Sequence, residues 1–503
     1  MKPNSDSYRT ILKSSSLIGG ASAINILLGA VRTKFMAVLL GPEGVGLIGT
    51  YATITTMATT VAGFGIGSGA VRSVAEAAGA GDLERVARTA AALRRTTRVL
   101  GAVGAVVLAL LSWPISSFTF KSSRHAWPLV ILAVTVFTGL VSAGQTSLVQ
   151  GMRRIGDLSR LNVVGGLLGT LAAVPLLICL GQTAILPLIL ACSLITMLAS
   201  WWYARKLSLE TLRLTWRETW AETRGMLQMG VAFLVTGILA ALVAYVIRAL
   251  VVRDLGMEAA GHYQAAFSLA GVYAGFVLQA MGADFFPRLT AMAHDNLQCN
   301  RLVNEQSEVS LLLVGPGVLF TLAFAPVVIH VFYAASFQPA VELLRWFAIG
   351  LLLRVISWPL GFILVAKGLA CLFMWTELVS NMVYVALLFV GVHYVGLVGT
   401  ALGFIGYYAF YLAMIATIAW RISGFRWSES NLRYGVSVIG VALGLLGLSF
   451  AIKETVVAVI GSGGALAFGF FSLRRLSVTL RGTRFEPYLA RVAPSWLYSS
   501  STM

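Results

Sequence analysis

The sequence predicts an all-α polytopic membrane protein, with about twelve to fourteen transmembrane helices in two pseudo-symmetric six-helix lobes around a central cavity. Hydrophobic residues make up 58% of the 503 residues and charged residues only 11%, against about 25% in an ordinary soluble protein. Apolar stretches of roughly 20 residues, the length that crosses a bilayer, recur along the chain. Glycine-containing loop motifs repeat at a constant offset, which indicates two similar halves.

The expected spans divide the chain into helices joined by short loops. They lie near residues 11–40, 47–78, 96–113, 127–150, 161–180, 185–204, 228–252, 261–287, 309–332, 341–366, 371–391, 395–420, 435–452 and 455–473. Four parts follow: an N-terminal six-helix lobe over 1–204, a cytoplasmic linker helix over 205–227, a C-terminal six-helix lobe over 228–420, and two accessory helices with a basic cytoplasmic tail over 421–503. The linker resembles an interfacial amphipathic helix, and a plain connection is the alternative.

Lysine and arginine set the orientation, because short cytoplasmic loops are enriched in them. With the N-terminus inside, most of the 37 such residues lie in cytoplasmic segments, and only Lys121, Arg124, Arg253 and Lys453 face outward. Both termini are therefore predicted to be cytoplasmic. The net charge of +17 is a topology signal, strengthened by attraction to anionic lipids, and does not indicate nucleic-acid binding. The four cysteines lack metal or redox spacing, so we expect neither a metal ion nor a cofactor.

A repeat with an offset of 215 residues relates the two lobes. Gly41-Pro42-Glu43-Gly44-Val45-Gly46 follows the first span and Gly256-Met257-Glu258-Ala259-Ala260-Gly261 follows the seventh. The same offset pairs Gly181 with Gly396. Because an even number of spans separates the copies, an axis along the membrane normal should relate the halves, with a cleft between them.

Basic residues recur inside the predicted spans. The offset maps Arg248 between Arg32 and Lys34, and it maps Arg288 beside Arg72. Snorkelling to the interface is one interpretation, since Arg32, Lys34 and Arg248 lie only about 8 to 12 Å below their helix ends. Their recurrence at two depths favours residues that line the cleft. Asp284 precedes Arg288 by four residues and either pairs with it or takes part in coupling.

The segment over 341–381 carries the strongest charge signal. Arg345 and Arg354 lie nine residues apart, so a helix places Arg354 about 13 Å deeper, where a charge costs roughly 2.5 to 3.5 kcal/mol. Pro359 predicts a bend just below Arg354. Glu377 and Asn381 share a face of the next helix, and they either neutralise Arg354 or bind a coupling ion, Na⁺ or H⁺.

Several of these segments resemble a known family. GADFFPRLTAMA, NRLVNEQSEV, FAPVVI, LLRWFAIGLLLRVISWPLGFILVAKG and FMWTELVSN are similar to the O-antigen translocase and lipid III flippase type of polysaccharide flippase. That type belongs to the multidrug/oligosaccharidyl-lipid/polysaccharide exporter superfamily. Such proteins have two six-helix lobes around a cavity that opens alternately to either side of the bacterial inner membrane. The extra helix pair at 435–452 and 455–473 departs from their usual plan of twelve.

The resemblance implies a cargo of undecaprenyl-pyrophosphate-linked oligosaccharide, an O-antigen or common-antigen repeat unit, moved from the cytoplasmic to the periplasmic leaflet. An O-antigen polymerase and a chain-length regulator are the further partners it implies, besides membrane lipids. Basic side chains suit the pyrophosphate, and arginine matches phosphate oxygens bidentately. The expected substrate contacts are Arg32, Lys34, Arg72, Arg248, Arg288 and Arg354. Tyr51, Trp358 and Tyr407 are candidates for stacking on sugar rings.

Three other functions compete with this interpretation. A multidrug antiporter for cations would share the architecture, but its chamber should be acidic, whereas here the basic span residues face only Asp284, Glu377 and Glu76. A membrane glycosyltransferase or polymerase should expose catalytic carboxylates or arginines on a sizeable outer loop, and the longest outer loop, Pro114 to Ala126, contains no carboxylate. A scaffold without transport would not need charges inside its spans. The sequence therefore favours a transporter over an enzyme.

Overall fold

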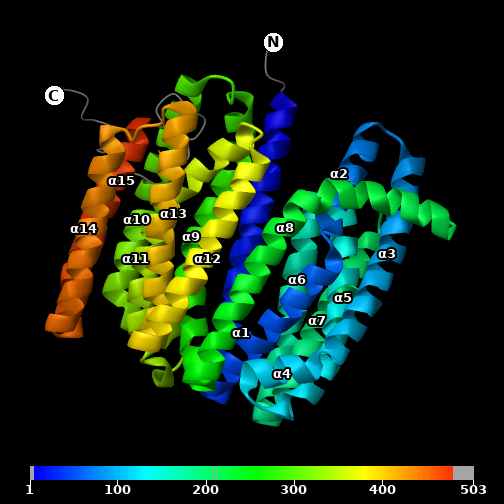
Figure 1. Ribbon diagram of the computed structural model, residues 1–503, viewed down its shortest axis with the longest axis horizontal. Coiled ribbons are helices and arrows are strands. Elements are labelled where there is room, and N and C mark those ends of the chain that lie inside the picture. Colours follow the sequence, from blue (N-terminus) through cyan, green and yellow to red (C-terminus); the bar gives the residue numbers. More distant parts are fainter. Residues whose placement is uncertain (1–4, 208, 211, 480–503) are drawn as a thin grey trace. The chain divides into compact units, whose positions relative to one another are not determined.

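The computed structural model describes residues 5–207, 209–210 and 212–479, without the side chains of residues 5–19, 229, 231–233, 273, 276, 279–284 and 478–479. The chain forms two compact units (Figure 1): unit 1 comprises Met1–Gly261 and Phe332–Ser336, and unit 2 comprises His262–Val331 and Phe337–Met503. Ten helical stretches of the described chain are long and apolar enough to cross a membrane, or eleven if a bent pair counts as one. This confirms the predicted all-α polytopic fold.

Unit 1 is a bundle in which α3, α5, α6 and α7 run side by side (Figure 1). Its helices are α1 (Ser5–Gly63), α2 (Ile66–Gly79), α3 (Leu83–Leu110), α4 (Ser112–Phe120), α5 (Ala126–Gly151), α6 (Ile155–Leu180), α7 (Ile185–Arg205) and α8 (Trp216–Leu255), with 3₁₀ turns at Ser123–His125 and Gly181–Ala184.

Two breaks interrupt the helical chain between Ser5 and Gly79. Gly41, with φ 65°, divides α1 between the first two predicted spans, and Pro42 restarts the helix. The predicted span over 47–78 is not one helix, because Phe64 and Gly65 adopt φ of 45° and 69° between α1 and α2. Helix α8 approaches closely at this break: a Cβ added at Gly65 would lie 2.7 Å from the carbonyl oxygen of Gly230.

The segments at the ends of α3 and α8 also differ from their predicted forms. The loop expected over 114–126 is mostly helical, because α4 continues after α3 at an angle of 56°. The linker expected as a separate helix over 205–227 is not helical at residues 206–207, 209–210 and 212–215, and α8 starts only at Trp216. A capping box of Thr215 and Glu218 fixes that start, and the guanidinium of Arg95 lies 3.5 Å from the Trp216 ring centroid. Hydrogen bonding to Thr215 lowers the pKa of Glu218.

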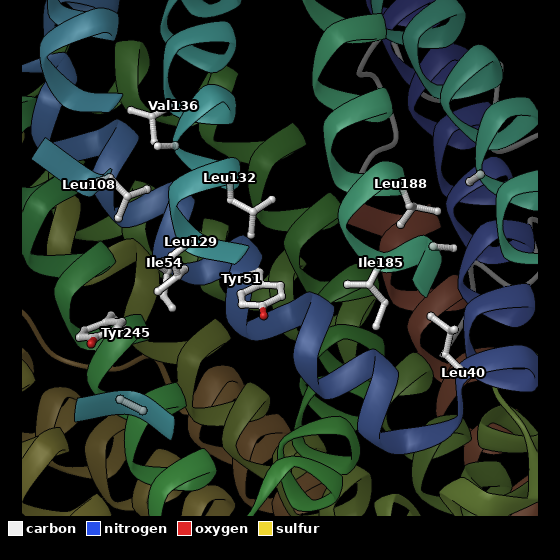
Figure 2. Close-up of a cluster of buried hydrophobic side chains, with 14 of the residues drawn as sticks. Leu40, Tyr51, Ile54, Leu108, Leu129, Leu132, Val136, Ile185, Leu188 and Tyr245 are labelled. Carbon is white, nitrogen blue, oxygen red and sulfur yellow. The ribbon is translucent and has the colours of Figure 1, made fainter. Parts of the chain in front are cut away.

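The core of unit 1 is apolar with a few hydrogen-bonded tyrosines. Figure 2 shows Tyr51 of α1 among Leu129 and Leu132 of α5 and Ile185 of α7. The hydroxyl of Tyr51 lies 2.8 Å from Nδ1 of His125, so a polar atom is buried without the cost of a lost hydrogen bond.

Unit 2 contains most of α9 (Met257–Ala291), then α10 (Asn296–Phe332), a 3₁₀ turn at Ala335–Phe337, α11 (Ala340–Ala366), α12 (Ala370–Val395), α13 (Val398–Ser423), α14 (Glu429–Ala451) and α15 (Glu454–Thr479). Both accessory helices, α14 and α15, are long and apolar enough to span. The helical backbone of α11 continues through Pro359, so the predicted bend below Arg354 is not a break of the kind seen at Gly41.

The backbone conformations of the repeat glycines support the predicted repeat. Gly41 and Gly256 have φ of 65° and 91° with ψ of −171° and 176°. Gly181 and Gly396, at the same offset, have φ of 56° and 64° with ψ of −128° and −136°. Glycine is the residue that reaches these regions at low cost, so the repeat preserves helix ends and not only sequence letters.

Candidate functional site

A cluster of tyrosines lies among α11, α12 and α13 of unit 2, together with Arg354 and Glu377. Glycines on α11 allow the close approach of α13: a Cβ added at Gly350 would lie 2.4 Å from Cδ1 of Phe404, and one at Gly361 would lie 2.7 Å from the hydroxyl of Tyr411. The tyrosine cluster, as we call it, comprises Tyr384 of α12 and Tyr407, Tyr408 and Tyr411 of α13 with these two charged residues.

The rings of the tyrosine cluster are in direct contact. The centroid of Tyr407 lies 4.8 Å from that of Tyr384, 4.5 Å from that of Tyr408 and 6.2 Å from that of Tyr411. Tyr384 and Tyr411 are buried. Several hydroxyls are thereby concentrated in an apolar helix bundle, where each gains from a polar partner.

Arg354 and Glu377 both lie near this ring cluster. Tyr407 is within electrostatic range of both charges, and Tyr411 donates a hydrogen bond to the Glu377 carboxylate. Both charged side chains are half-buried. The ion pairs between helices of unit 2 that the described residues form join Arg345 to Glu454 and Arg475 to Glu308, and Arg354 takes part in neither. Its guanidinium is therefore available to a ligand.

Asn381 lies one turn after Glu377 on α12. Its amide nitrogen donates a hydrogen bond of 2.8 Å to the backbone carbonyl of Glu377. The amide therefore supports the helix turn that carries the carboxylate, and a direct role in ion binding stays a prediction.

The predicted cations of α1 contact two different parts of unit 1. Nη1 of Arg32 lies 3.8 Å from Sγ of Cys192 on α7, which is a weak acceptor. Nζ of Lys34 donates to the backbone carbonyl of Tyr333, in the short segment that unit 1 takes from the end of α10 and the loop after it. Both side chains are half-buried.

Arg248 and Arg72, also in unit 1, differ in exposure. Arg248 is only 5% exposed, and its Nη1 donates a 3.1 Å hydrogen bond to the carbonyl of Ala260, just after the junction of α8 and α9. Arg72 is 68% exposed and pairs with Glu76 at 2.9 Å. The four predicted cations of unit 1 thus each have a different partner.

The remaining predicted residues have mixed outcomes. Arg288 is exposed on α9, and the side chain of Asp284 lies outside the described residues, so their pairing stays a prediction. Trp358 packs on Phe362 with centroids 4.6 Å apart, and Tyr51 is bonded to His125 in a core. Of the three aromatics expected to stack on sugars, Tyr407 is the one in the tyrosine cluster. No group of three or more His, Cys, Asp or Glu in the described chain could hold a metal ion.

Sequence reasoning missed most of the tyrosine cluster. The pair Tyr407 and Tyr411, one turn apart, was a usable signal, since residues four apart share a helix face. Tyr384 comes from another helix and carries no comparable signal. The ion pair between the guanidinium of Arg345 and the carboxylate of Glu454, which we call the fork, joins residues 109 positions apart. No local sequence pattern indicates it.

One protein family matches most of the chain. The family described as polysaccharide biosynthesis protein matches residues 35–342. The lipid III flippase of Escherichia coli (strain K12) is 24% identical over 430 residues, which cover 82% of this chain and 99% of the relative. The lipid III flippase of Shigella flexneri gives the same values.

Solved structures share the fold. An inward-facing multidrug resistance MATE family transporter of the MOP superfamily superposes with a TM-score of 0.66 at 15% identity, over 84% of this chain and 96% of its own. The lipid II flippase MurJ in an inward closed conformation gives 0.65 at 11% identity, over 94% and 99%. A MOP superfamily transporter from Pyrococcus furiosus gives 0.58 at 16% identity, over 82% and 96%.

Proposed function

Because this chain belongs to the polysaccharide biosynthesis protein family, we propose that it is a flippase that moves lipid-linked oligosaccharides across a membrane. The names of its lipid III flippase relatives support this activity, and the shared fold with a lipid II flippase agrees with it. The observation that carries the proposal is the half-buried Arg354, which has no described carboxylate partner and lies within electrostatic range of Tyr407 and Tyr408. A guanidinium and phenols suit a phosphate-bearing sugar lipid.

The proposed cargo is an undecaprenyl-pyrophosphate-linked repeat unit of O-antigen or common antigen, carried from the cytoplasmic to the periplasmic leaflet of the bacterial inner membrane. In the proposed topology, both termini lie in the cytoplasm. The lobes over 1–204 and 228–420 would open alternately to the two sides, and the cations of the predicted set would contact the pyrophosphate in turn. Energy would come from Na⁺ or H⁺ through Glu377, and a polymerase with its chain-length regulator would consume the product.

A transport assay separates this proposal from a cation antiporter. The purified protein is reconstituted in proteoliposomes, and translocation of a lipid-linked oligosaccharide is measured beside export of a cationic dye. We expect translocation of the oligosaccharide lipid and no export of the dye. Dye export without lipid translocation would instead favour the antiporter.

Replacement of Arg354 tests its role in the same assay. Arg354→Ala should lower translocation by at least about tenfold, since one lost charge-assisted contact is worth 1.5 to 3 kcal/mol. Arg354→Lys should restore only part of the translocation, because an ammonium cannot donate two parallel hydrogen bonds to a phosphate as a guanidinium does. Arg421→Ala, at an exposed arginine of α13, is the matched control and should leave translocation unchanged. Wild-type rates in a folded Arg354→Ala protein would remove this residue from the site.

A further inference from the structure

A cavity of about 210 Å³ lies inside unit 1, apart from the helices of the tyrosine cluster. Helix α3 contributes Arg94, Thr97 and Arg98, α5 contributes Val141 and Gln145, and α7 contributes Trp201, Ala204 and Arg205. These residues lie near the ends of α3, α5 and α7 that are predicted to be cytoplasmic. The volume suits a phosphate group and the atoms next to it.

We call this pocket the arginine cavity, because every charged residue of its lining is an arginine. It is lined by three arginines and by no acidic side chain. Arg94 and Arg98 lie one turn apart on α3, where like charges repel. Neither of them, nor Arg205, takes part in an ion pair among the described residues, whereas the nearby Arg88 pairs with Glu218. An anion in the cavity would relieve this repulsion.

The donors of the arginine cavity are its guanidinium groups, and its uncharged polar residues add no negative charge. Gln145 is 9% exposed, and its Oε1 lies 2.6 Å from the hydroxyl of Ser200. The hydroxyl of Thr97 donates to the carbonyl of Leu93 at 2.9 Å, which holds that side chain against its own helix. An anion in the cavity would therefore be bound by Arg94, Arg98 and Arg205.

Aromatic residues place the arginine cavity at a membrane interface. Trp201 and Trp202 are 45% and 57% exposed, as in the aromatic belts at bilayer surfaces. The guanidinium of Arg205 lies 5.4 Å from the Trp201 ring centroid, and the ammonium of Lys206 lies 4.5 Å from that of Tyr203. A ligand that enters beside these rings would come from the bilayer surface.

We propose that the arginine cavity binds the phosphate of an anionic membrane phospholipid, held by Arg94 and Arg98 from α3 and by Arg205 from α7. Basic pockets between helices on the cytoplasmic side are sites of this kind. The ligand is a resident lipid of the inner leaflet, which ties α3 to α7, and it is distinct from the transported cargo. The proposal does not depend on the proposed flippase activity.

Lipid binding to the purified full-length protein tests the proposal. The protein is titrated with phosphatidylglycerol, with phosphatidylcholine and with inorganic phosphate, and bound lipid is counted by native mass spectrometry beside the thermal midpoint. We expect phosphatidylglycerol to bind and raise the midpoint while phosphatidylcholine does not. The double variant Arg94→Gln/Arg98→Gln should bind it at least about tenfold more weakly.

Arg85→Gln/Arg160→Gln removes the same charge from exposed positions of unit 1 and is the matched control, expected to bind like the wild type. Arg205→Gln, at the exposed rim, should weaken binding even if the double variant fails to fold. Equal losses in the control and the double variant would reduce the effect to surface charge and overturn the proposal. Inorganic phosphate that competes as well as the lipid would identify a free-phosphate site instead, which also overturns it.

Discussion

Glu377 is hydrogen-bonded to a tyrosine, and it forms no ion pair with a cation among the described residues. Tyr411 donates to its carboxylate, and Tyr407 lies within electrostatic range of both Glu377 and Arg354. A carboxylate that only balanced Arg354 would gain most from a direct fork with the guanidinium, which the described contacts do not include. Charge balance of Arg354 and coupling to an ion gradient therefore stay two predictions for Glu377, which substitution can separate.

Substitution of Glu377 separates charge balance from coupling. Glu377→Gln should keep the protein folded but flatten the dependence of lipid translocation on the Na⁺ or H⁺ gradient, because the amide neither titrates nor attracts a cation. The measurement is translocation in proteoliposomes with imposed gradients. Glu429→Gln, at an exposed carboxylate of α14, is the control.

The double variant Arg354→Gln/Glu377→Gln completes this test. If Glu377 only balances Arg354, the double variant should be no worse than Arg354→Gln, since no uncompensated charge is left. If Glu377 instead couples transport to an ion gradient, the double variant should lose both the substrate contact of Arg354 and the gradient dependence. An unchanged gradient dependence in Glu377→Gln would end the coupling interpretation.

Single charges inside apolar sequence could be located without the structure, whereas their partners could not. Arg354 and Glu377 stand out because a charge in a span needs a reason. Arg248 and Lys34 each donate to a backbone carbonyl, of Ala260 and Tyr333, and a carbonyl has no residue-specific signal in a sequence. Which side of a helix faces which neighbour depends on rotation about its axis, and uniformly apolar spans leave that rotation unmarked.

Among the elements, α15 is fixed to unit 2 at both of its ends. At its start, Glu454 accepts both arms of the Arg345 guanidinium, whose Nε also donates to the carbonyl of Leu322 at 3.2 Å. Near its end, Arg475 pairs with Glu308 of α10 at 3.1 Å. Small residues allow close contact between these points: a Cβ added at Gly461 would lie 2.4 Å from that of Ala323. The accessory helix is therefore an integral part of unit 2.

Breaking the fork should loosen α15. Arg345 is only 4% exposed while the Glu454 side chain is about half exposed, so we expect Glu454→Gln to cost about 1 to 3 kcal/mol, below the range for a fully buried pair. The measurements are the thermal midpoint and protease cleavage between α14 and α15. Arg433→Gln, from an exposed pair with Glu429 on α14, should change the midpoint little. Equal effects of the two variants would show that the fork does not hold α15.

Helix boundaries were predictable where the sequence itself carries the stop. Gly41-Pro42 marks the break in α1, and Gly181 and Gly396 end α6 and α12. The close contact of Gly65 with the backbone of Gly230 was not predictable, because Gly230 lies far along the chain. Helix α8 starts directly after its N-cap, Thr215, which begins the capping signal Thr-x-x-Glu. The amphipathic pattern of the linker obscured this signal.

At the scale of the whole molecule, the two copies of the loop motif touch each other. A Cβ added at Gly46 would lie 2.3 Å from the carbonyl oxygen of Met257, and one at Gly261 would lie 1.9 Å from that of Pro42. The repeat offset relates Gly46 to Gly261 and Pro42 to Met257, so each contact is the symmetry counterpart of the other. Glycine is required at both crossings, since any side chain would meet a backbone atom.

This contact places a constraint on topology, because two loops that touch must lie on the same side of the membrane. We therefore expect reporters fused after Gly41, Arg124 or Glu258 to report the outer side, and reporters fused after Arg85, Arg154, Arg217 or Asn300 to report the cytoplasm. The excess of lysine and arginine in the second set of loops is the physical reason for this orientation. Reporter enzymes active only in one compartment, compared at equal expression, provide the measurement. Opposite results at Gly41 and Glu258 would contradict the contact itself, and an external result at Arg217 would break the arrangement of two six-helix lobes.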